Sequence, residues 1–394
     1  MKKFIAIIMV AMFALSMVAC SQPAAEETPA TEETPATEET AAPEASAEAA
    51  SEYKVAMITD YGDITDQSFN QTTYEACKAF CEEKGIDFNY FKPAGDSDAE
   101  RVAMIESSID EGYNVVVMPG YAFAGAIKET AGTYSDVTFI ALDVSASDLG
   151  DDYQLPSNLY CAVYQEELCG YMAGYAAVKL GYKNLGFLGG MAVPAVVRYG
   201  YGFVQGVDAA AAALGLTDVK LNYVYGGQFY GDADITAVMD TWYANGTEVV
   251  FACGGGIYTS AVEAALKNNG YVIGVDVDQN YIGANGVADG TYAYNPFITS
   301  AMKGLSEAVS TSLSDIEAGE WSTIAATNGN FGLEDGDYIG LPTADDSWNF
   351  ETFTTEEYEE VKDKIKNGEI TVDNSSDDAT KPTVSEFTTV NYIQ

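Results

Sequence analysis

The sequence predicts an α/β protein built from two Rossmann-like lobes that are joined by a hinge. From Tyr53 onward, short apolar runs alternate with segments of helical periodicity, which is typical of βαβ units around a parallel sheet. The alternation restarts near Leu185, so a second set of units follows the first. The chain has 394 residues, which is long for one compact core, and 47% of them are hydrophobic, which is ample for two.

The first set of units begins directly after Tyr53. Its apolar runs are short and are bounded by turn residues, as in buried strands, and the longer segments between them carry apolar residues at helical spacing. We expect strands over residues 54–59, 86–91, 115–118 and 138–142, and helices over residues 68–84, 99–111 and 122–131.

The second set repeats this pattern. We expect a helix from Pro194 to about Leu214, further helices between the later strands, and strands over residues 185–188, 219–225, 249–253 and 272–275. Ligands of such sheets lie beyond the carboxyl ends of the strands, so two facing lobes line a cleft there. We assign residues 53–164 plus about 278–304 to the N-terminal lobe, and residues 165–277 plus about 305–394 to the C-terminal lobe.

The beginning of the chain has the pattern of a secretory signal. Two lysines precede an apolar run of about 15 residues, which is shorter than the roughly 20 that a transmembrane helix needs. We therefore expect a signal peptide over residues 1–19. The segment Met17–Cys20 resembles the lipobox of bacterial lipoproteins, which implies that Cys20 is lipidated and that the exported chain is anchored to the cell membrane on its extracytoplasmic face.

Residues 20–52 are expected to form the lipidated cysteine and a disordered acidic linker. The segment Glu26–Thr31 recurs as Glu32–Thr37, and the region lacks aromatic and large aliphatic side chains. Burial therefore cannot offset the entropy that ordering would cost. Proline and mutually repelling glutamates favour an extended tether.

Composition excludes several classes of function. The chain has 60 acidic and 18 basic residues, a net charge of -42, so nucleic acid is an unlikely partner and phosphorylated ligands are disfavoured. A neutral or cationic small ligand fits better. Histidine is absent, which removes histidine-based catalytic triads and histidine metal ligands. We expect no enzymatic activity, no metal and no cofactor.

The cysteines give no disulfide framework. Cys77 and Cys81 are four residues apart in a helical pattern, a spacing that favours helix packing over a disulfide. Whether Cys161, Cys169 and Cys253 pair is left open.

Three aspartates stand where predicted strands end, namely Asp60, Asp143 and Asp276. A carboxylate in such a place can accept two hydroxyl protons at once, which suits a sugar with adjacent hydroxyls. Capping of the next helix is an equally good interpretation of each of them alone.

Two aromatic residues and a run of glycines stand near these aspartates. Phe69 and Phe229 are candidates for stacking on an aromatic base. Core packing is the commoner role of a lone phenylalanine such as Phe69, whereas glycines flank Phe229 and make both roles equally good for it. Gly254, Gly255 and Gly256 form either a turn that a ligand approaches closely or a plain tight turn. A lysine and a hydroxyl residue do not follow them, so they are no phosphate loop.

Taken together, these features resemble the basic membrane protein family, the purine nucleoside receptor A-like solute-binding lipoproteins of ABC transporters. The resemblance extends from Tyr53 to about Gly336. It rests on short motifs with family-specific spacing: Thr59–Asp60, Asp66–Gln71, Gly186–Met191, Pro194, Gly202–Phe203, Gly206, Gly227–Phe229, Gly274–Gln279, Thr299–Ser300, Lys303 and Phe331–Leu333. It implies the type I periplasmic-binding-protein fold, with a nucleoside, expected to be a purine nucleoside, held between the lobes.

The resemblance also implies roles for polar residues. By motif position, Asp276 and Lys303 would hold the ribose and Asp143 would read the base edge. Asp60 and Asn70 would line the same pocket. An ABC permease and its ATPase are the implied partners, and a monomer is the expected state.

In the same way, the resemblance implies that Phe69 and Phe229 sandwich the base, while Gly254 and Gly255 let the backbone approach the ligand. The chain departs from the family pattern directly afterwards, where Tyr258 stands in a run that is usually rich in glycine. We expect Tyr258 to narrow the pocket or to add a stacking ring, which leaves the identity of the base open.

Two other functions remain as alternatives. A binder of another small sugar-like or signalling ligand would have the same architecture and similar aromatic residues. A secreted nucleosidase would use clustered carboxylates to hold a metal that activates water. The acids stand at separate strand ends and histidine is absent, which favours a binding protein over the nucleosidase.

Overall fold

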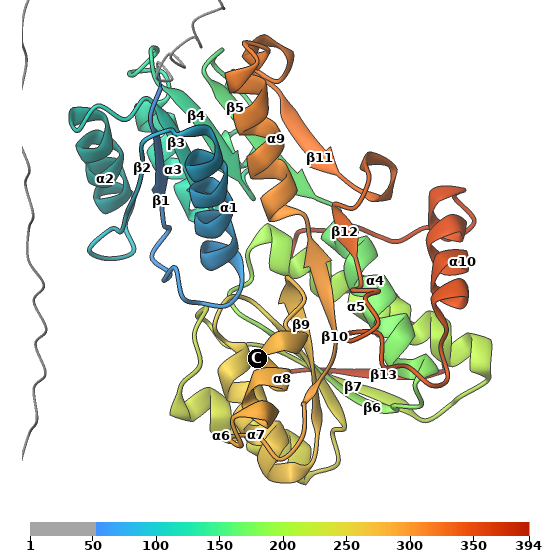
Figure 1. Cartoon of the computed structure of the whole chain (residues 1–394). Coiled ribbons are helices and arrows are strands. Elements are labelled where there is room, and N and C mark those ends of the chain that lie inside the picture. Colours follow the sequence, from blue (N-terminus) through green and yellow to red (C-terminus); the bar gives the residue numbers. More distant parts are fainter. Residues whose placement is uncertain (1–52, 394) are drawn as a thin grey trace, which may run out of the picture. The chain divides into compact units, whose positions relative to one another are not determined.

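The computed structural model describes residues 53–393. The predicted signal peptide, Cys20 and the linker lie outside the described residues. Two sheets, each with helices on both faces, form the described part (Figure 1). Every neighbouring pair of strands in them is parallel except β10 and β12. The predicted α/β class with two parallel-sheet lobes is confirmed.

The first lobe is built on a sheet that has six strands within the described residues, in the order β11-β5-β4-β3-β1-β2. Its strands are β1 (Val55–Ile58), β2 (Phe88–Phe91), β3 (Val115–Pro119), β4 (Thr138–Leu142), β5 (Leu159–Tyr164) and β11 (Asn328–Phe331). Its helices are α1 (Phe69–Lys84), α2 (Asp98–Asp110), α3 (Ala124–Thr130) and α9 (Leu305–Glu317). Helices α1 and α9 pack on one face of the sheet, and α2 and α3 on the other.

The second lobe is built on a sheet that has seven strands within residues 53–393, in the order β12-β10-β9-β8-β6-β7-β13. Its strands are β6 (Asn184–Gly189), β7 (Val219–Tyr225), β8 (Val249–Cys253), β9 (Tyr271–Asp276), β10 (Phe297–Lys303), β12 (Ile339–Gly340) and β13 (Thr388–Tyr392). Its helices are α4 (Glu166–Lys179), α5 (Pro194–Leu214), α6 (Ala233–Ala244), α7 (Tyr258–Asn268), α8 (Asn280–Ala288) and α10 (Thr355–Lys366). Helices α4 and α5 cover one face of this sheet, and α6 and α7 the other.

The central strands are apolar along their whole length because helices cover both of their faces. Val115 and Val117 belong to the core on the α1 side, whereas Val116 and Met118 belong to the core on the α2 side. This division follows from the period of two in a strand, which points successive side chains to opposite faces. Continuous apolar runs therefore predicted these strands well.

The predicted bounds of α5 are confirmed, and local chemistry explains both ends. Pro194 occupies the first turn, where its missing N–H costs no hydrogen bond. Gly215 ends the helix in the left-handed conformation, with φ of 65°, which glycine adopts without steric cost.

The predicted division of the late chain between the lobes was wrong. Strand β10 pairs in parallel with β9, so residues 297–303 belong to the second sheet. Helix α9 then packs against α1, and β11 pairs with β5, so this part of the chain returns to the first lobe. The physical reason is that β10 extends the second sheet beside β9, and the chain leaves that sheet only at Gly304.

Three segments therefore connect the lobes. They lie between β5 and α4, between β10 and α9, and between β11 and β12. Such a set of parallel connections is the expected construction of a hinge.

The cysteines are not paired. Cys77, Cys81, Cys161, Cys169 and Cys253 are all free and buried in the described part of the chain. The helix-packing role of Cys77 and Cys81 is confirmed, since both lie in the core with α1. None of the helices within residues 53–393 combines the length and apolar composition needed to span a bilayer.

Helices α4 and α5 are in direct backbone contact. A Cβ atom added to Gly202 would lie 1.8 Å from the carbonyl oxygen of Glu167, and one added to Gly206 would lie 2.0 Å from that of Tyr171. Gly170 and Gly174 on α4 are equally close to the backbone of α5. Glycine on both helices therefore sets how closely they pack.

We expect Gly202→Ala to lower the free energy of unfolding by about 1–3 kcal/mol, because the new methyl group forces two backbones apart. Gly132→Ala is the matched control, since no atom lies within 4 Å of the added Cβ. Its free energy of unfolding should lie within about 1 kcal/mol of that of the unmodified protein or slightly above it. Urea unfolding of the three proteins measures this, and equal stabilities would contradict the packing argument.

Candidate functional site

One cavity of about 380 Å³ lies where the two lobes face each other. Every residue that the sequence analysis proposed for ligand binding lines it: Asp60, Phe69, Asn70, Asp143, Phe229, Gly254, Gly255, Asp276 and Lys303. These residues come from both lobes and are spread from Asp60 to Lys303, yet the fold brings them together.

The strand ends explain this convergence. Asp143 directly follows β4, Asp276 ends β9 and Lys303 ends β10. Asp143 and Asp276 have positive φ angles of 58° and 68°, in the left-handed region that few residues other than glycine adopt. Aspartate tolerates this conformation better than most residues, and such strain is typical of sites where a side chain must take one direction.

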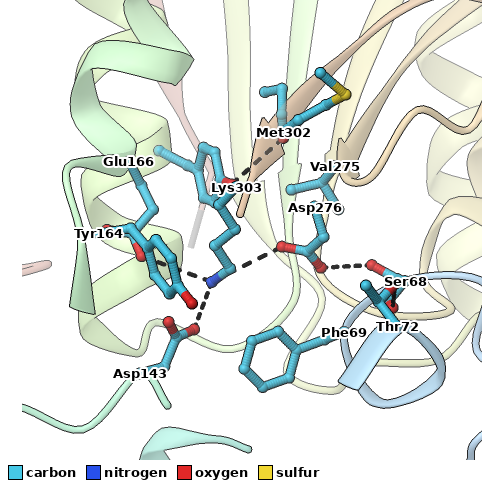
Figure 2. A network of polar contacts seen from close by, with 12 residues as sticks. Ser68, Phe69, Thr72, Asp143, Tyr164, Glu166, Val275, Asp276, Met302 and Lys303 are labelled. Atoms are coloured by element: carbon cyan, nitrogen blue, oxygen red, sulfur yellow. Dashed lines mark hydrogen bonds and ion pairs between the residues drawn. The ribbon is translucent and has the colours of Figure 1, made fainter. Parts of the chain in front are cut away.

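Lys303 is the electrostatic centre of the cavity. Its Nζ lies 2.5 Å from Asp143 Oδ2, 3.6 Å from Glu166 Oε1 and 3.8 Å from Asp276 Oδ1. Figure 2 shows the ammonium group between these carboxylates, with the ring of Phe69 close by. The ring centre of Phe69 is 4.7 Å from the same nitrogen.

These contacts determine the protonation states of Lys303 and Asp143. Burial lowers the pKa of Lys303, but the attraction of the three carboxylates is larger in sum, and its pKa lies above the ordinary value. Burial raises the pKa of Asp143, Lys303 lowers it and Glu166 raises it again, with the result at about 6. Lys303 is therefore a cation at neutral pH, while Asp143 titrates just below neutrality.

Glu166 and Arg198 belong to this network and were missed by the sequence analysis. Arg198 Nε donates to Glu166 Oε2 at 2.6 Å, so Glu166 connects Arg198 to Lys303. The available signal was a pair of acids, Glu166 and Glu167, directly after an apolar run that forms β5. Nothing in the local sequence indicates that the partners of Glu166 come from α5 and β10.

Asp60 lines the cavity from the first lobe, directly after β1. Its Oδ1 accepts hydrogen bonds from the backbone N–H groups of Tyr61 and Gly62, at 2.6 and 2.7 Å. Burial raises the pKa of Asp60 above its ordinary value, although these bonds act in the other direction. Gly120, with φ of 124°, lies against Asp60, where a Cβ atom would be 3.2 Å from Oδ2.

Two acceptor atoms at the cavity have no protein partner. Asn70 Oδ1 and Asp143 Oδ1 are buried side-chain oxygens without a hydrogen-bond partner among the described residues. Burying such an atom unpaired costs about 1–3 kcal/mol. The cavity thus offers acceptors for which a ligand with N–H or O–H groups would supply donors.

The ring of Phe229 packs directly against the backbone of two glycines. A Cβ atom at Gly190 would lie 2.2 Å from its ring carbon Cδ1, and one at Gly254 would lie 2.8 Å from the same atom. Gly254 also has φ of 142°, so glycine is required there on two grounds. Both glycines therefore let the ring of Phe229 lie close to the backbone of the second lobe.

The lobes touch each other beside the cavity. Ser68 Oγ donates to Asp276 Oδ2 at 2.5 Å, and Gln279 Nε2 donates to the carbonyl oxygen of Gln67 at 3.0 Å. Tyr281 donates from its hydroxyl group to Gln67 Oε1 at 2.7 Å. These contacts connect the residues before α1 to the residues around the start of α8, so the structure is a closed form.

Tyr258 does not take part, contrary to expectation. It is only 7% exposed and packs on Phe297, with ring centres 6.0 Å apart, outside the residues that line the cavity. Its place at the start of α7 turns its side chain into the core on the outer face of the sheet. No cluster of three or more aspartate, glutamate or cysteine side chains arranged to hold a metal occurs among residues 53–393.

Comparison with known proteins identifies the family. A model of ABC transporter substrate-binding proteins described as PnrA-like matches residues 53–376. The chain belongs to the basic membrane protein family of ABC transporter substrate-binding proteins. The predicted resemblance is thereby confirmed.

Relatives within this family are distant in sequence. The ABC transporter nucleoside-binding protein BmpA of Lactococcus lactis subsp. cremoris (strain MG1363) is 28% identical over 253 residues, covering 61% of this chain and 68% of that protein. Basic membrane protein B of Borreliella afzelii (strain PKo) is 27% identical over 336 residues, covering 82% and 88%.

Solved structures agree on the fold. An ABC transporter solute-binding protein from Aeropyrum pernix K1 superimposes with a TM-score of 0.68 at 21% identity, covering 83% of this chain and 95% of that one. The fold of this substrate-binding protein is that of type I periplasmic binding proteins, as predicted.

Glu167 follows Glu166 on α4 of this binding protein, next to the hinge, and is also a buried acid. Burial raises the pKa of Glu167 to about 7, and Glu167 Oε2 has no hydrogen-bond partner among the described residues. Its pKa in the folded protein is thus above the unfolded value near 4.5. The folded state then holds a proton that the unfolded chain has lost, and stability falls as pH rises from about 4.5 to about 7.

We expect Glu167→Gln to remove this decrease in stability with rising pH. It should raise the free energy of unfolding at pH 8 by about 1–3 kcal/mol, with little effect at pH 4.5. Urea unfolding at both pH values measures it. Glu129→Gln, at an exposed position on α3, is the control and should change neither value. A variant at Glu167 that is less stable at pH 8 would show that the carboxylate is ionised and paired.

Proposed function

We propose that this protein binds a nucleoside, in the first place a purine nucleoside, in the cavity between its lobes and delivers it to an ABC permease. The carrying observation is that one cavity between the lobes combines two kinds of surface. Aromatic rings, among them Phe69 and Phe229, line it together with buried acceptors and the Lys303 network. A nucleoside joins a flat apolar ring to a hydroxyl-rich sugar, so it matches both.

The polar surface suits hydrogen-bond donors. Asp143 Oδ1 and Asn70 Oδ1 are free to accept, and Asp60 and Asp276 supply further carboxylate oxygens. Hydrogen bonds to charged groups contribute about 1.5–3 kcal/mol each. Because closure excludes water, these bonds are less screened than at an exposed surface.

The aromatic surface adds stacking. Stacking of one base on an aromatic side chain contributes about 1–3 kcal/mol. With several charged hydrogen bonds, this supports a micromolar dissociation constant, about −8 kcal/mol, after the costs of ordering are met. The name of the Lactococcus lactis relative supports the same ligand class, since that protein is described as nucleoside-binding.

Binding and delivery would proceed through hinge closure. The open lobes admit the ligand, and the contacts of Ser68 and Gln67 with the second lobe then close over it. The closed form docks on the permease, and a separate ATPase supplies the energy. In this proposal Cys20 carries the lipid that anchors the protein as a monomer at the extracytoplasmic face of the membrane, with residues 21–52 as the tether.

We expect calorimetric titration to give micromolar binding of adenosine, guanosine or inosine, and weaker binding of cytidine and ribose, because only a purine fills the aromatic surface. Mass spectrometry of any co-purified ligand is an independent check. Tighter binding of ribose than of every nucleoside would reject this function in favour of a sugar binder. Release of hypoxanthine from inosine would reveal a nucleosidase instead.

We also expect nucleoside affinity to depend on pH through Asp143. With a pKa of about 6, this carboxyl group is ionised at pH 7.5 and protonated at pH 5. If the ionised form accepts the ligand's donors, affinity falls about tenfold between pH 7.5 and pH 5, and binding at pH 6 releases about half a proton per ligand. Calorimetry in two buffers of different ionisation enthalpy measures the released proton.

Variants assign this pH dependence. Asp143→Asn should weaken binding about tenfold at pH 7.5 and abolish the dependence, because the amide does not titrate. Asp63→Asn is the control, since Asp63 lines the same cavity but Lys92 holds its pKa below the ordinary value. It should keep the dependence of the original protein. Unchanged pH dependence in Asp143→Asn would exclude Asp143 as its source.

A further inference from the structure

Gln67 makes hydrogen bonds to the second lobe with both its backbone and its side chain. Its carbonyl oxygen accepts from Gln279 Nε2 at 3.0 Å, and its Oε1 accepts from the hydroxyl group of Tyr281 at 2.7 Å. Ser68, the next residue, donates to Asp276 at the same boundary (Figure 2). One short segment before α1 therefore makes all three of these contacts between the lobes.

The backbone of Gln67 is held in an unfavourable conformation. Its φ angle is 57°, in the left-handed region that few residues other than glycine adopt. The side chain of Gln71 stabilises this turn, because the backbone N–H and Nε2 of Gln67 both donate to Gln71 Oε1, at 3.0 and 2.6 Å. Such strain persists only where the surroundings impose it, and it is typical of functional positions.

Asp66 fixes the rest of the turn. Its Oδ1 accepts from the backbone N–H groups of Ser68 and Gln71, at 2.9 and 3.1 Å, and its Oδ2 accepts from that of Asn70 at 3.0 Å. The N–H groups at the start of a helix have no partner within the helix, so the carboxylate satisfies them. Residues 66–71 are thereby held in one arrangement, and Gln67 is its point of contact with the second lobe.

The partner of Gln67 in the second lobe is also fixed. Gln279 is fully buried, its backbone N–H donates to Ser300 Oγ at 2.9 Å, and its Oε1 accepts from the N–H of Val275 at 3.1 Å. Its Nε2 is then the group that donates to the first lobe. Because both partners are ordered by their own lobes, their contact costs little further side-chain entropy.

The contact of Gln67 with the second lobe lies outside the cavity. Among the described residues, the cavity wall includes Phe69 and Asp276 but not Gln67, Gln279 or Tyr281. A ligand is therefore not needed to complete these bonds. Their free energy favours the closed form whichever molecule the cavity holds.

We infer that Gln67 is a positioning residue that latches the two lobes together through Gln279 and Tyr281, with or without a ligand, and so sets the closed fraction of the protein. This inference goes beyond the proposed function, since it does not depend on which ligand the cavity holds. The apparent dissociation constant of a ligand held by the closed form is the intrinsic constant divided by the closed fraction. A weaker latch therefore lowers the affinity for every ligand by the same factor, whereas a residue that touches the ligand discriminates between ligands.

The test weakens the latch from both lobes, with Tyr281→Phe, Gln67→Ala and the double variant. Tyr281→Phe removes one hydroxyl group, keeps the ring, and should raise every dissociation constant about 2- to 10-fold. Gln67→Ala removes the acceptor of the same bond and should have at least this effect. Because the two side chains bond to each other, the double variant should exceed the larger single effect by less than about twofold.

Calorimetric titration with guanosine, inosine and cytidine measures these constants. In each variant, the factor of weakening should agree among the three nucleosides to within about twofold. Tyr90→Phe is the matched control, because Tyr90 is 38% exposed against 40% for Tyr281 and packs on Tyr74 within the first lobe. It should leave every constant unchanged.

Small-angle X-ray scattering of the ligand-free proteins tests closure alone. The double variant should have a larger radius of gyration than the original protein, because a smaller fraction of it is closed. Tyr90→Phe should scatter as the original protein does. Circular dichroism and thermal unfolding establish that each variant folds.

The outcomes separate the latch from the proposed function. If no nucleoside binds but the double variant is less compact than the original protein, the proposed function is wrong and the latch stands. If the double variant scatters as the original protein does, the latch is overturned, whether or not nucleosides bind. Unequal losses of affinity among the three nucleosides would also overturn it, since Gln67 would then act on the ligand and not on closure.

Discussion

The ammonium group of Lys303 is the point at which the two lobes are joined electrostatically. It lies within 4 Å of Asp143 at the end of β4, Asp276 at the end of β9 and Glu166 at the start of α4. Three buried carboxylates so close together would repel one another strongly without a cation among them. Lys303 itself ends β10, immediately before the chain crosses back to the first lobe. The same ion-pair network thus fixes the hinge and forms the charged end of the cavity.

Backbone geometry around this network follows from the need to aim side chains inward. Asp143 and Asp276 adopt positive φ angles directly after their strands, which turns each carboxylate toward Lys303 instead of along the sheet. In the second lobe, the absence of side chains at Gly190 and Gly254 lets Phe229 approach the backbone. The aspartates with positive φ and the glycines without side chains serve the same purpose. Both let functional groups near the strand ends approach one another more closely than ordinary residues would allow.

The candidate residues chosen from the sequence line one cavity. Those at strand ends, Asp60, Asp143 and Asp276, could be located because continuous apolar runs mark where the strands end. The late chain was assigned to the wrong lobes because the βα units of both lobes have the same periodicity. Nothing in the local sequence indicates that β10 extends the second sheet while α9 packs on α1. Helix α4 was missed since it is buried on nearly all sides and shows no polar stripe. The ring contact between Tyr61 and Phe229 was not predicted either, because the two residues are distant in sequence and come from different lobes.

The balance of charge around the cavity also constrains the ligand. Lys303 and Arg198 are two cations set among three carboxylates, those of Asp143, Asp276 and Glu166. Both cations are already engaged, so neither is free to bind a phosphate or carboxylate group, whereas Asp143 Oδ1 remains an unpaired acceptor. Burial raises the pKa of Asp60 and Asp276 as well, which shows that the cavity holds its negative charges against a cost. A neutral ligand that brings hydrogen-bond donors lowers that cost, while an anion would increase it. Under the proposed function, this network would therefore favour a nucleoside over a nucleotide.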